Sequence, residues 1–170
     1  MFDVDSFLLS ARYGDYPDFL THATPLSPSQ LSTQNSLGNT ALHFAAANNH
    51  PQIVGYLVSK LSPALINLQN QEGNTPLHWA CLNGHKEIVE LLIKNGSDPC
   101  IVNKMGKDSI FEAQSSGKEE IVDYLLENLK EDGDWCEDVK LESTEEVVED
   151  EDAEEEQIPE LIQEDEEAER

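Results

Sequence analysis

The feature that most constrains this chain is a motif that recurs along its first 130 residues. GNTALHFA at residues 38–45 returns as GNTPLHWA at residues 73–80, an offset of 35, and a weaker third copy begins at Gly106, 33 residues further on. A period of this length is typical of stacked supersecondary units. Shifting the alignment back by 35 residues finds a degenerate copy of the motif at the amino end, in which Gly14 aligns with Asn49. We therefore count four units.

Each unit is predicted to hold a turn, a first helix, a short turn and a second helix. The residues expected to open the first helices share a side-chain oxygen that can accept from free N–H groups; they are Asp5, Thr40, Thr75 and Asp108. Those expected to close the same helices are Gly or Asn, which enter the left-handed region readily; they are Gly14, Asn49, Gly84 and Gly117. Apolar residues at helical spacing follow, so each unit has a face that only its neighbours can bury.

Charge divides the chain near residue 130. Residues 1–130 hold 14 acidic and 8 basic residues, a net charge of −6, whereas residues 131–170 hold 21 and 2, a net charge of −19. The second part has too few apolar groups to offset the entropy lost on ordering. We expect one domain over residues 1–130 and a disordered acidic tail over residues 131–170. A total charge of −25 repels polyanions, so we expect no direct nucleic-acid ligand.

The repeated wording resembles the ankyrin repeat family. GNTPLHWA at residues 73–80 is followed by NGHKEIVELL at residues 83–92 and GSDP at residues 96–99. The resemblance implies an all-α solenoid of about four helix–turn–helix repeats with β-turn or hairpin connections, at about residues 4–37, 38–72, 73–105 and 106–130. Leu8 and Phe111 replace the motif histidine in the outer repeats, which suits capping units. The structural motif residues implied are Thr40, His43, Thr75, Pro76, Leu77 and His78.

Partner contacts are expected at the positions that this motif leaves free. In ankyrin proteins the turns and first helices line a concave groove that binds other proteins. Carried over to this chain, the partner-binding residues are Phe44, Asn48, Gln69, Gln71, Trp79, Leu82, Asn83, Lys104, Met105, Glu112 and Ser115. Large apolar side chains such as Trp79 and Phe44 at free positions either pack between first helices or contact a partner, and Trp is enriched at binding hot spots.

The sequence gives no support for catalysis. It has no phosphate-binding glycine loop, no G-x-S-x-G motif and no paired carboxylates within the repeats. His78, Cys81 and His85 have metal-ligand residue types at i, i+3 and i+7, but a zinc site needs a fourth ligand and none is adjacent. We predict a non-enzyme with no catalytic residue, no metal and no cofactor. A zinc enzyme built on His78 and Cys81 remains an alternative, which predicts stoichiometric zinc.

The sequence of the last repeat resembles a particular group within this family. VNKMGKDSIFEA at residues 102–113 and SGKEE at residues 116–120 are similar to the small fungal ankyrin-repeat chaperones dedicated to a KH-domain ribosomal protein of the small subunit. The resemblance implies a chaperone that binds this newly made basic protein through the groove and acidic tail and keeps it soluble until ribosome assembly. The tail interleaves acids with apolar residues, which independently favours a basic partner.

Other expectations complete this interpretation. The acidic start MFDVD does not suit a secretory signal, and no apolar run approaches the roughly 20 residues of a membrane span. We therefore expect a monomer without membrane contact, found in the cytoplasm and, as the resemblance implies, in the nucleus. The alternative function is an ankyrin adaptor or inhibitor in a signalling or regulatory complex. Such a protein would bind an ordinary folded domain and tolerate loss of the tail.

Overall fold

The computed structural model describes residues 3–132, which form helices α1 to α10 and contain no strand. The all-α prediction is therefore confirmed for this part of the chain. The last helix ends at Asp132, so it includes the first two residues of the predicted acidic tail. The rest of that tail, residues 133–170, lies outside the described residues, as do residues 1–2.

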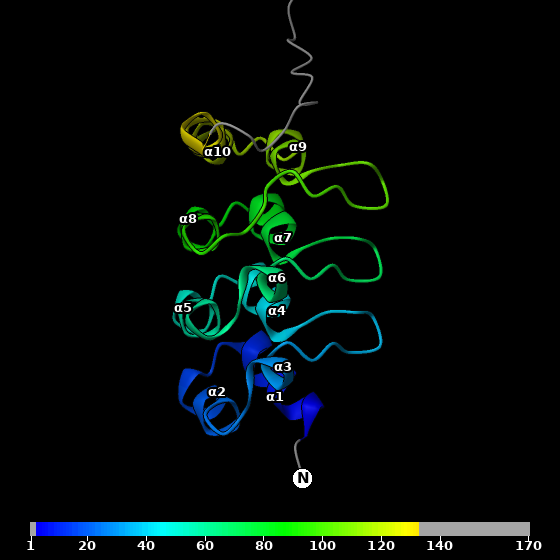
Figure 1. Ribbon diagram of the computed structural model, residues 1–170, viewed down its shortest axis with the longest axis vertical. Coiled ribbons are helices and arrows are strands. Elements are labelled where there is room, and N and C mark those ends of the chain that lie inside the picture. The colour runs from blue at the N-terminus through cyan, green and yellow to red at the C-terminus, as the bar shows by residue number, and fades with distance from the viewer. Residues whose placement is uncertain (1–2, 133–170) are drawn as a thin grey trace, which may run out of the picture. The chain divides into compact units, whose positions relative to one another are not determined.

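Two parallel rows of helices make the stack (Figure 1). One row holds the first helix of each repeat: α1 (Val4–Tyr13), α4 (Ala41–Ala47), α7 (Pro76–Asn83) and α9 (Ser109–Ser115). The other row holds the second helices: α2 (Tyr16–Ala23), α5 (Pro51–Lys60), α8 (Lys86–Lys94) and α10 (Glu119–Asp132). Within each row every helix packs against its neighbours, so each repeat is buried by the repeats next to it.

The predicted helix starts hold in three repeats and fail in the first. Thr40, Thr75 and Asp108 are N-cap residues, and the Asp108 side chain accepts from the N–H of Phe111 at 2.7 Å. In the first repeat the N-cap is Asp3, not Asp5, and its side chain accepts from the N–H of Asp5. Because no turn from an earlier repeat precedes this helix among the described residues, α1 extends further towards the amino end, over 10 residues against 7 in α4.

The predicted ends of the first helices are confirmed. All four residues have a positive φ; they are Gly14, Asn49, Gly84 and Gly117. Asn49 is the non-glycine member, at φ 60°, and Asn is among the side chains that tolerate this region best. These left-handed residues turn the chain back so that each second helix runs beside the first helix of its own repeat.

Two single-turn helices were not predicted. α3 (Pro28–Leu31) and α6 (Pro63–Ile66) each begin at the proline of a Ser-Pro pair, and the Ser is the N-cap residue in both cases. Pro suits the first position of a helix because the N–H that it lacks has no partner there. In the next repeat no such helix forms between α8 and α9. This difference accounts for the repeat offset of 35 at one junction and 33 at the next.

The core follows the apolar spacing of the second helices. Ile88, Val89 and Leu92 are fully buried, as are the equivalent residues of α5. In α10, Ile121 and Leu125 are buried, whereas Val122 is only partly buried. No further repeat covers α10 among the described residues, which explains the partial exposure of Val122.

Candidate functional site

Three turns project side by side from the row of first helices (Figure 1); we call residues 34–39 the first turn, 69–74 the second turn and 102–107 the third turn. One backbone hydrogen bond joins each neighbouring pair. The N–H of Gln71 donates to the carbonyl oxygen of Leu37, and the N–H of Lys104 donates to that of Glu72, both at 3.0 Å. The turns therefore form a hydrogen-bonded ladder, which we call the turn ladder.

The close approach of the turns requires glycine at two positions. Gly38 and Gly73 have φ of 78° and 81°, and a Cβ atom at either would lie 2.8 Å from the backbone nitrogen of the next turn. At Gly106, the equivalent residue of the third turn, φ is 72° and nothing lies within 4 Å of that position. The outer edge of the third turn is therefore open.

Side-chain amides strengthen the turn ladder. The Nε2 atom of Gln34 donates to the carbonyl oxygen of Gln69, and that of Gln69 donates to the carbonyl oxygen of Val102, both at 3.0 Å. The Nε2 atom of Gln71 donates to the carbonyl oxygen of Ser36 at 2.6 Å. Gln69 and Gln71 were predicted to bind a partner. Their amides hold neighbouring turns together, and their contact with a partner stays a prediction.

The motif histidines connect the first helices to the turns. His43 Nδ1 accepts from the backbone N–H of Thr40 at 3.2 Å and lies 2.9 Å from its hydroxyl, while Nε2 donates to the carbonyl oxygen of Asn74 at 2.9 Å. Both ring nitrogens are therefore used. Burial is the main reason that the pKa of His43 falls to about 4, so the ring is neutral at pH 7. It has no nitrogen left to act as a base or a metal ligand.

The second motif histidine has the same arrangement. His78 Nδ1 lies 2.8 Å from the Thr75 hydroxyl, and Nε2 donates to the carbonyl oxygen of Lys107 at 3.1 Å. Burial lowers the pKa of His78. Pro76 and Leu77, the remaining motif residues, are buried at the start of α7. These residues position the turns rather than face a partner.

The alternative of a zinc enzyme needs a set of metal ligands. Within residues 3–132, no group of three His, Cys, Asp or Glu side chains could hold a metal ion. His78 is committed to its hydrogen bonds, and His85 Nε2 donates to the carbonyl oxygen of Ala47 at 3.0 Å. Cys81 is fully buried, and burial raises the pKa of its thiol, which keeps it protonated.

An aromatic pair lies on the face formed by the first helices. Phe44 and Trp79, both half-buried, meet edge to face with ring centroids 6.4 Å apart, and the Trp79 ring also stands against His43 at 5.7 Å. Part of each ring therefore packs within the stack and part remains exposed. The two alternatives considered for these residues, packing and partner contact, are both compatible with this geometry.

A cavity of about 260 Å³ lies beside Phe44. It is lined by Phe44 with Asp5, Leu8, Leu9, Arg12 and Asn35. Leu9, which is 45% exposed, occupies the position equivalent to Phe44 and Trp79, at the same offset of 35 residues. Sequence reasoning missed Leu9 because the groove positions were not carried into the degenerate first repeat, although the offset itself identifies it. An apolar side chain at this position therefore recurs in three repeats.

The ends of the first helices carry other predicted residues. Leu82 is exposed, and next to it the Asn83 amide donates to the carbonyl oxygen of Ala47 at 3.1 Å. The Asn48 amide donates to the carbonyl oxygen of Phe44 at 2.8 Å. Leu82 thus presents an apolar surface, whereas the two Asn side chains are engaged with backbone.

The remaining predicted residues belong to the last repeat. Lys104 and Met105 are exposed on the third turn, Met105 by 75%. Glu112 accepts from the Asn103 amide at 3.3 Å, and the Ser115 hydroxyl donates to the carbonyl oxygen of Glu112 at 3.2 Å. The predicted residues therefore spread over the first helices and the turns and do not form one compact cluster.

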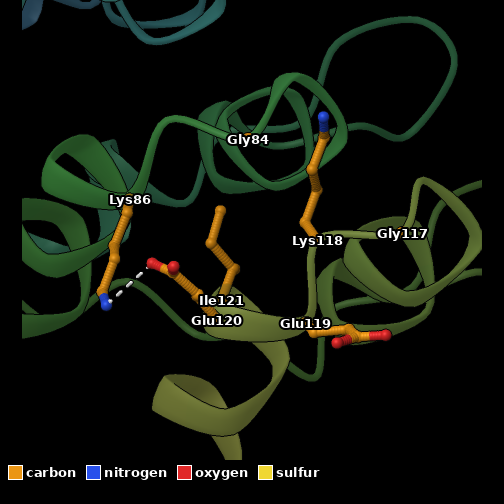
Figure 2. Close-up of a pocket in the computed structure, with 7 residues that line it drawn as sticks. All are labelled: Gly84, Lys86, Gly117, Lys118, Glu119, Glu120 and Ile121. Carbon is orange, nitrogen blue, oxygen red and sulfur yellow. Dashed lines mark hydrogen bonds and ion pairs between the residues drawn. The ribbon is translucent and has the colours of Figure 1, made fainter.

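A second cavity, of about 330 Å³, lies at the short turns between the helices of the last two repeats (Figure 2). Lys86 forms an ion pair with Glu120 at 3.2 Å, and Lys118 extends along Gly84. Lys86 and Lys118 are matched in number by the carboxylates of Glu119 and Glu120, so the lining has no net charge. This cavity offers no distinct chemistry for a ligand.

No helix within residues 3–132 combines the length and apolar character needed to cross a membrane.

Comparison with known proteins places these features in a family context. The ankyrin repeats (3 copies) family matches residues 7–103 and 60–134. The ankyrin repeat-containing protein YAR1 of Saccharomyces cerevisiae is 44% identical over 136 residues, which cover 73% of this chain and 68% of that protein. An ankyrin repeat-containing protein of Schizosaccharomyces pombe is 38% identical over 125 residues, covering 74% of this chain and 85% of its own length.

A solved structure matches as well. It is the crystal structure of the yeast ribosomal protein Rps3 in complex with its chaperone Yar1. The matching chain is 42% identical, with a TM-score of 0.68, and the match covers 74% of this chain and 92% of that chain.

Proposed function

We propose that this chain, which belongs to the ankyrin-repeat family, is a chaperone that binds a basic ribosomal protein of the small subunit, of the KH-domain type. The observation that carries the proposal is the match to the Rps3–Yar1 complex, at 42% identity over 92% of the matching chain. At this identity and coverage the likeness extends beyond the fold to the amino-acid sequence.

The groove supplies the shorter-range contacts. Leu9, Phe44 and Trp79 recur at one position of successive first helices, and Leu82 is exposed at the end of α7. Apolar and aromatic side chains in such a row can take up a helix or an extended segment of a partner, and anchors of this kind carry most of the energy of an interface. The groove would therefore set the lifetime of the complex.

The acidic segment supplies the longer-range attraction. Residues 131–170 have a net charge of −19, which attracts a protein rich in Lys and Arg before contact is made. The same charge competes with RNA for the basic surface of the client. A client covered in this way remains soluble until RNA displaces the chaperone at the ribosome precursor.

The protein acts without catalysis in this proposal. The motif histidines are buried and their ring nitrogens are engaged, and Cys81 is buried as a protonated thiol. We further propose that the protein works in both cytoplasm and nucleus, because a ribosomal protein is made in the first and assembled in the second.

The test is affinity purification of the full chain from nuclease-treated extract. One basic small-subunit ribosomal protein is expected to co-purify in near-equal amount, and its recovery should not depend on RNA. Recovery of a neutral or acidic folded domain instead would favour the signalling adaptor. Loss of the ribosomal protein after nuclease treatment would contradict direct binding.

A further inference from the structure

The third turn departs from the other two at the positions that face the next turn of the ladder. Where Gln34 and Gln69 donate an amide hydrogen bond forward, the equivalent residue is Val102. The Asn39 and Asn74 side chains each accept a hydrogen bond from an Asn amide of the next turn. The equivalent residue of the third turn is Lys107. The side chains that would continue the turn ladder are therefore replaced by an apolar and a basic residue.

The first helix of the last repeat departs in the same direction. His43 and His78 are 0% and 1% exposed and donate to the carbonyl oxygen of the following turn, whereas the equivalent Phe111 is 48% exposed. Val102 is 54% exposed. Terminal repeats of a solenoid need a polar outer face for solubility, and this one instead presents apolar side chains at the same positions.

The backbone of the third turn also remains available. Leu37 and Glu72 each accept a hydrogen bond from the next turn, while the equivalent carbonyl oxygen, that of Met105, has no acceptor role within residues 3–132. Beside it, a Cβ atom at Gly106 would have nothing within 4 Å. The edge is thus open to another backbone segment.

Two lysines at this edge are unpaired among residues 3–132. Neither Lys104 nor Lys107 forms an ion pair within the described part of the chain, and Lys107 Nζ lies 5.2 Å from the centre of the Phe111 ring. The nearby carboxylates keep their charge but are held in other contacts, because Asp108 accepts from the N–H of Phe111 and Glu112 accepts from Asn103. Lys104 and Lys107 are therefore available to the carboxylates of another segment, on the same turn as the exposed Val102.

We propose that this edge is a binding site for an extended, acidic segment of a partner protein. We call it the third-turn edge and define it by Val102, Lys104, Met105, Gly106, Lys107 and Phe111. The segment adds to the turn ladder by donating a backbone N–H to the carbonyl oxygen of Met105. An apolar side chain of the segment packs on Val102 and Phe111, and its carboxylates meet the two lysines.

The chemistry of the site excludes a second copy of the same turn. A repeated turn would bring the cations Lys104 and Lys107 but no carboxylate for them, and Val102 offers no amide. The proposal is also independent of the proposed chaperone function, because the segment bound here is acidic whereas the client of residues 131–170 is basic. Both could belong to one partner without competing.

The test is a titration of the full ¹⁵N-labelled chain with a synthetic eight-residue peptide of alternating Val and Glu, capped at both ends. Chemical shifts are expected to change at residues 102–111, with slower exchange of amides in that region. A peptide with Lys in place of Glu should bind at least about tenfold more weakly, and so should one whose N–H groups are methylated along one edge. Failure of the Glu peptide to shift residues 102–111, or equal binding by the Lys peptide, would overturn the proposal.

Variants distinguish binding at the third-turn edge from non-specific binding to the turns. The triple variant Val102→Gln, Lys107→Asn, Phe111→His restores the residues of the second turn and first helix, so it should fold and lose at least about tenfold in affinity. If it fails to fold, Lys107→Asn alone should still weaken binding. The matched control is Leu37→Gln, which changes an exposed apolar residue at the first turn and should leave binding unchanged. Unaltered binding by the folded variants would also overturn the proposal.

Discussion

The Nε2 atom of His43 donates to the carbonyl oxygen of Asn74 at 2.9 Å, so a side chain of one repeat fixes the turn of the next. His78 and Lys107 repeat this relationship one unit further along, at 3.1 Å. The two histidines therefore connect neighbouring repeats by hydrogen bonds. Their burial and their hydrogen bonds determine how the stability of the stack responds to mutation and to pH.

Replacing His43 by Ala should destabilise the domain. The change leaves the Asn74 carbonyl oxygen without its donor and opens a cavity at a fully buried position, which together should cost about 3 kcal/mol in the free energy of unfolding. Denaturant titration followed by circular dichroism measures the loss. His22→Ala, on the partly exposed end of α2, is the control and should change stability by less than about 0.5 kcal/mol. Equal effects would show that the buried histidine has no special role.

The free energy of unfolding should decrease as the pH is lowered from 6.5 to 4, and His43 should cause part of this decrease. The folded pKa is about 4 and the ordinary value is 6.5, so between these values the unfolded chain binds a proton that the folded chain does not. The free energy of unfolding should therefore decrease by about 1.4 kcal/mol for each pH unit lost in that window from this residue. Unfolding of the wild type and of His43→Gln across pH 4–7 checks this, because carboxylate effects are common to both. Identical pH slopes would contradict the assignment.

The groove prediction concerns Trp79 and Leu82. The double variant Trp79→Ala, Leu82→Ala should weaken binding of the ribosomal client by about 2 kcal/mol or more while helical content is kept. Calorimetry and circular dichroism together measure both quantities. Gln52→Ala, exposed on α5 in the other helix row, should leave binding unchanged. Unfolding of the double variant would mean that these side chains serve packing within the stack.

Two glycines at equivalent positions should respond differently to substitution. Gly73→Ala and Gly106→Ala both place a side chain at positive φ, but only at Gly73 does the Cβ meet backbone, at 2.8 Å from the Lys104 nitrogen. Gly73→Ala should therefore destabilise the domain by at least about 1 kcal/mol more than Gly106→Ala. Thermal unfolding of the pair tests the turn ladder directly. A larger loss at Gly106 would indicate that the third turn is not open at its outer edge.

Removal of residues 133–170 should change the kinetics of client binding. Most of the net charge of −19 carried by residues 131–170 is lost with this segment, so the association rate should fall and its dependence on salt should become weaker. Stopped-flow association across a salt series measures this, while cooperative melting of residues 1–132 should be retained. Equal salt slopes for the two forms would limit the segment to a role in solubility.

The repeat offset predicted most of the fold because it identifies the residues that occupy equivalent positions in successive repeats. Thr40 and Thr75 open helices, and Asn49 adopts the left-handed conformation expected from its alignment with glycine. The offset failed at Asp5, because α1 begins at Val4 with Asp3 as its N-cap, and no earlier turn contacts that start within residues 3–132. It also gave no warning of α3 and α6, although the Ser-Pro pairs at residues 27–28 and 62–63 were a local signal for both.

The candidate site was harder to predict, because exposure depends on what a neighbouring repeat covers. Gln69 and Gln71 occupy free positions of the motif, yet their amides are bound within the turn ladder. Conversely, Phe111 replaces a histidine that is buried in the inner repeats and is itself 48% exposed. No pattern within one repeat shows such differences, since they arise between repeats.

The row of motif histidines also limits how the array can grow by gene duplication. A copy of residues 73–105 inserted after the original would retain each donor and acceptor, because His78 would find the next turn in its usual place. A copy of the last repeat added at the end would instead present Phe111 to a turn that needs a donor. The chain can therefore lengthen from within, while its terminal repeat marks where the array stops.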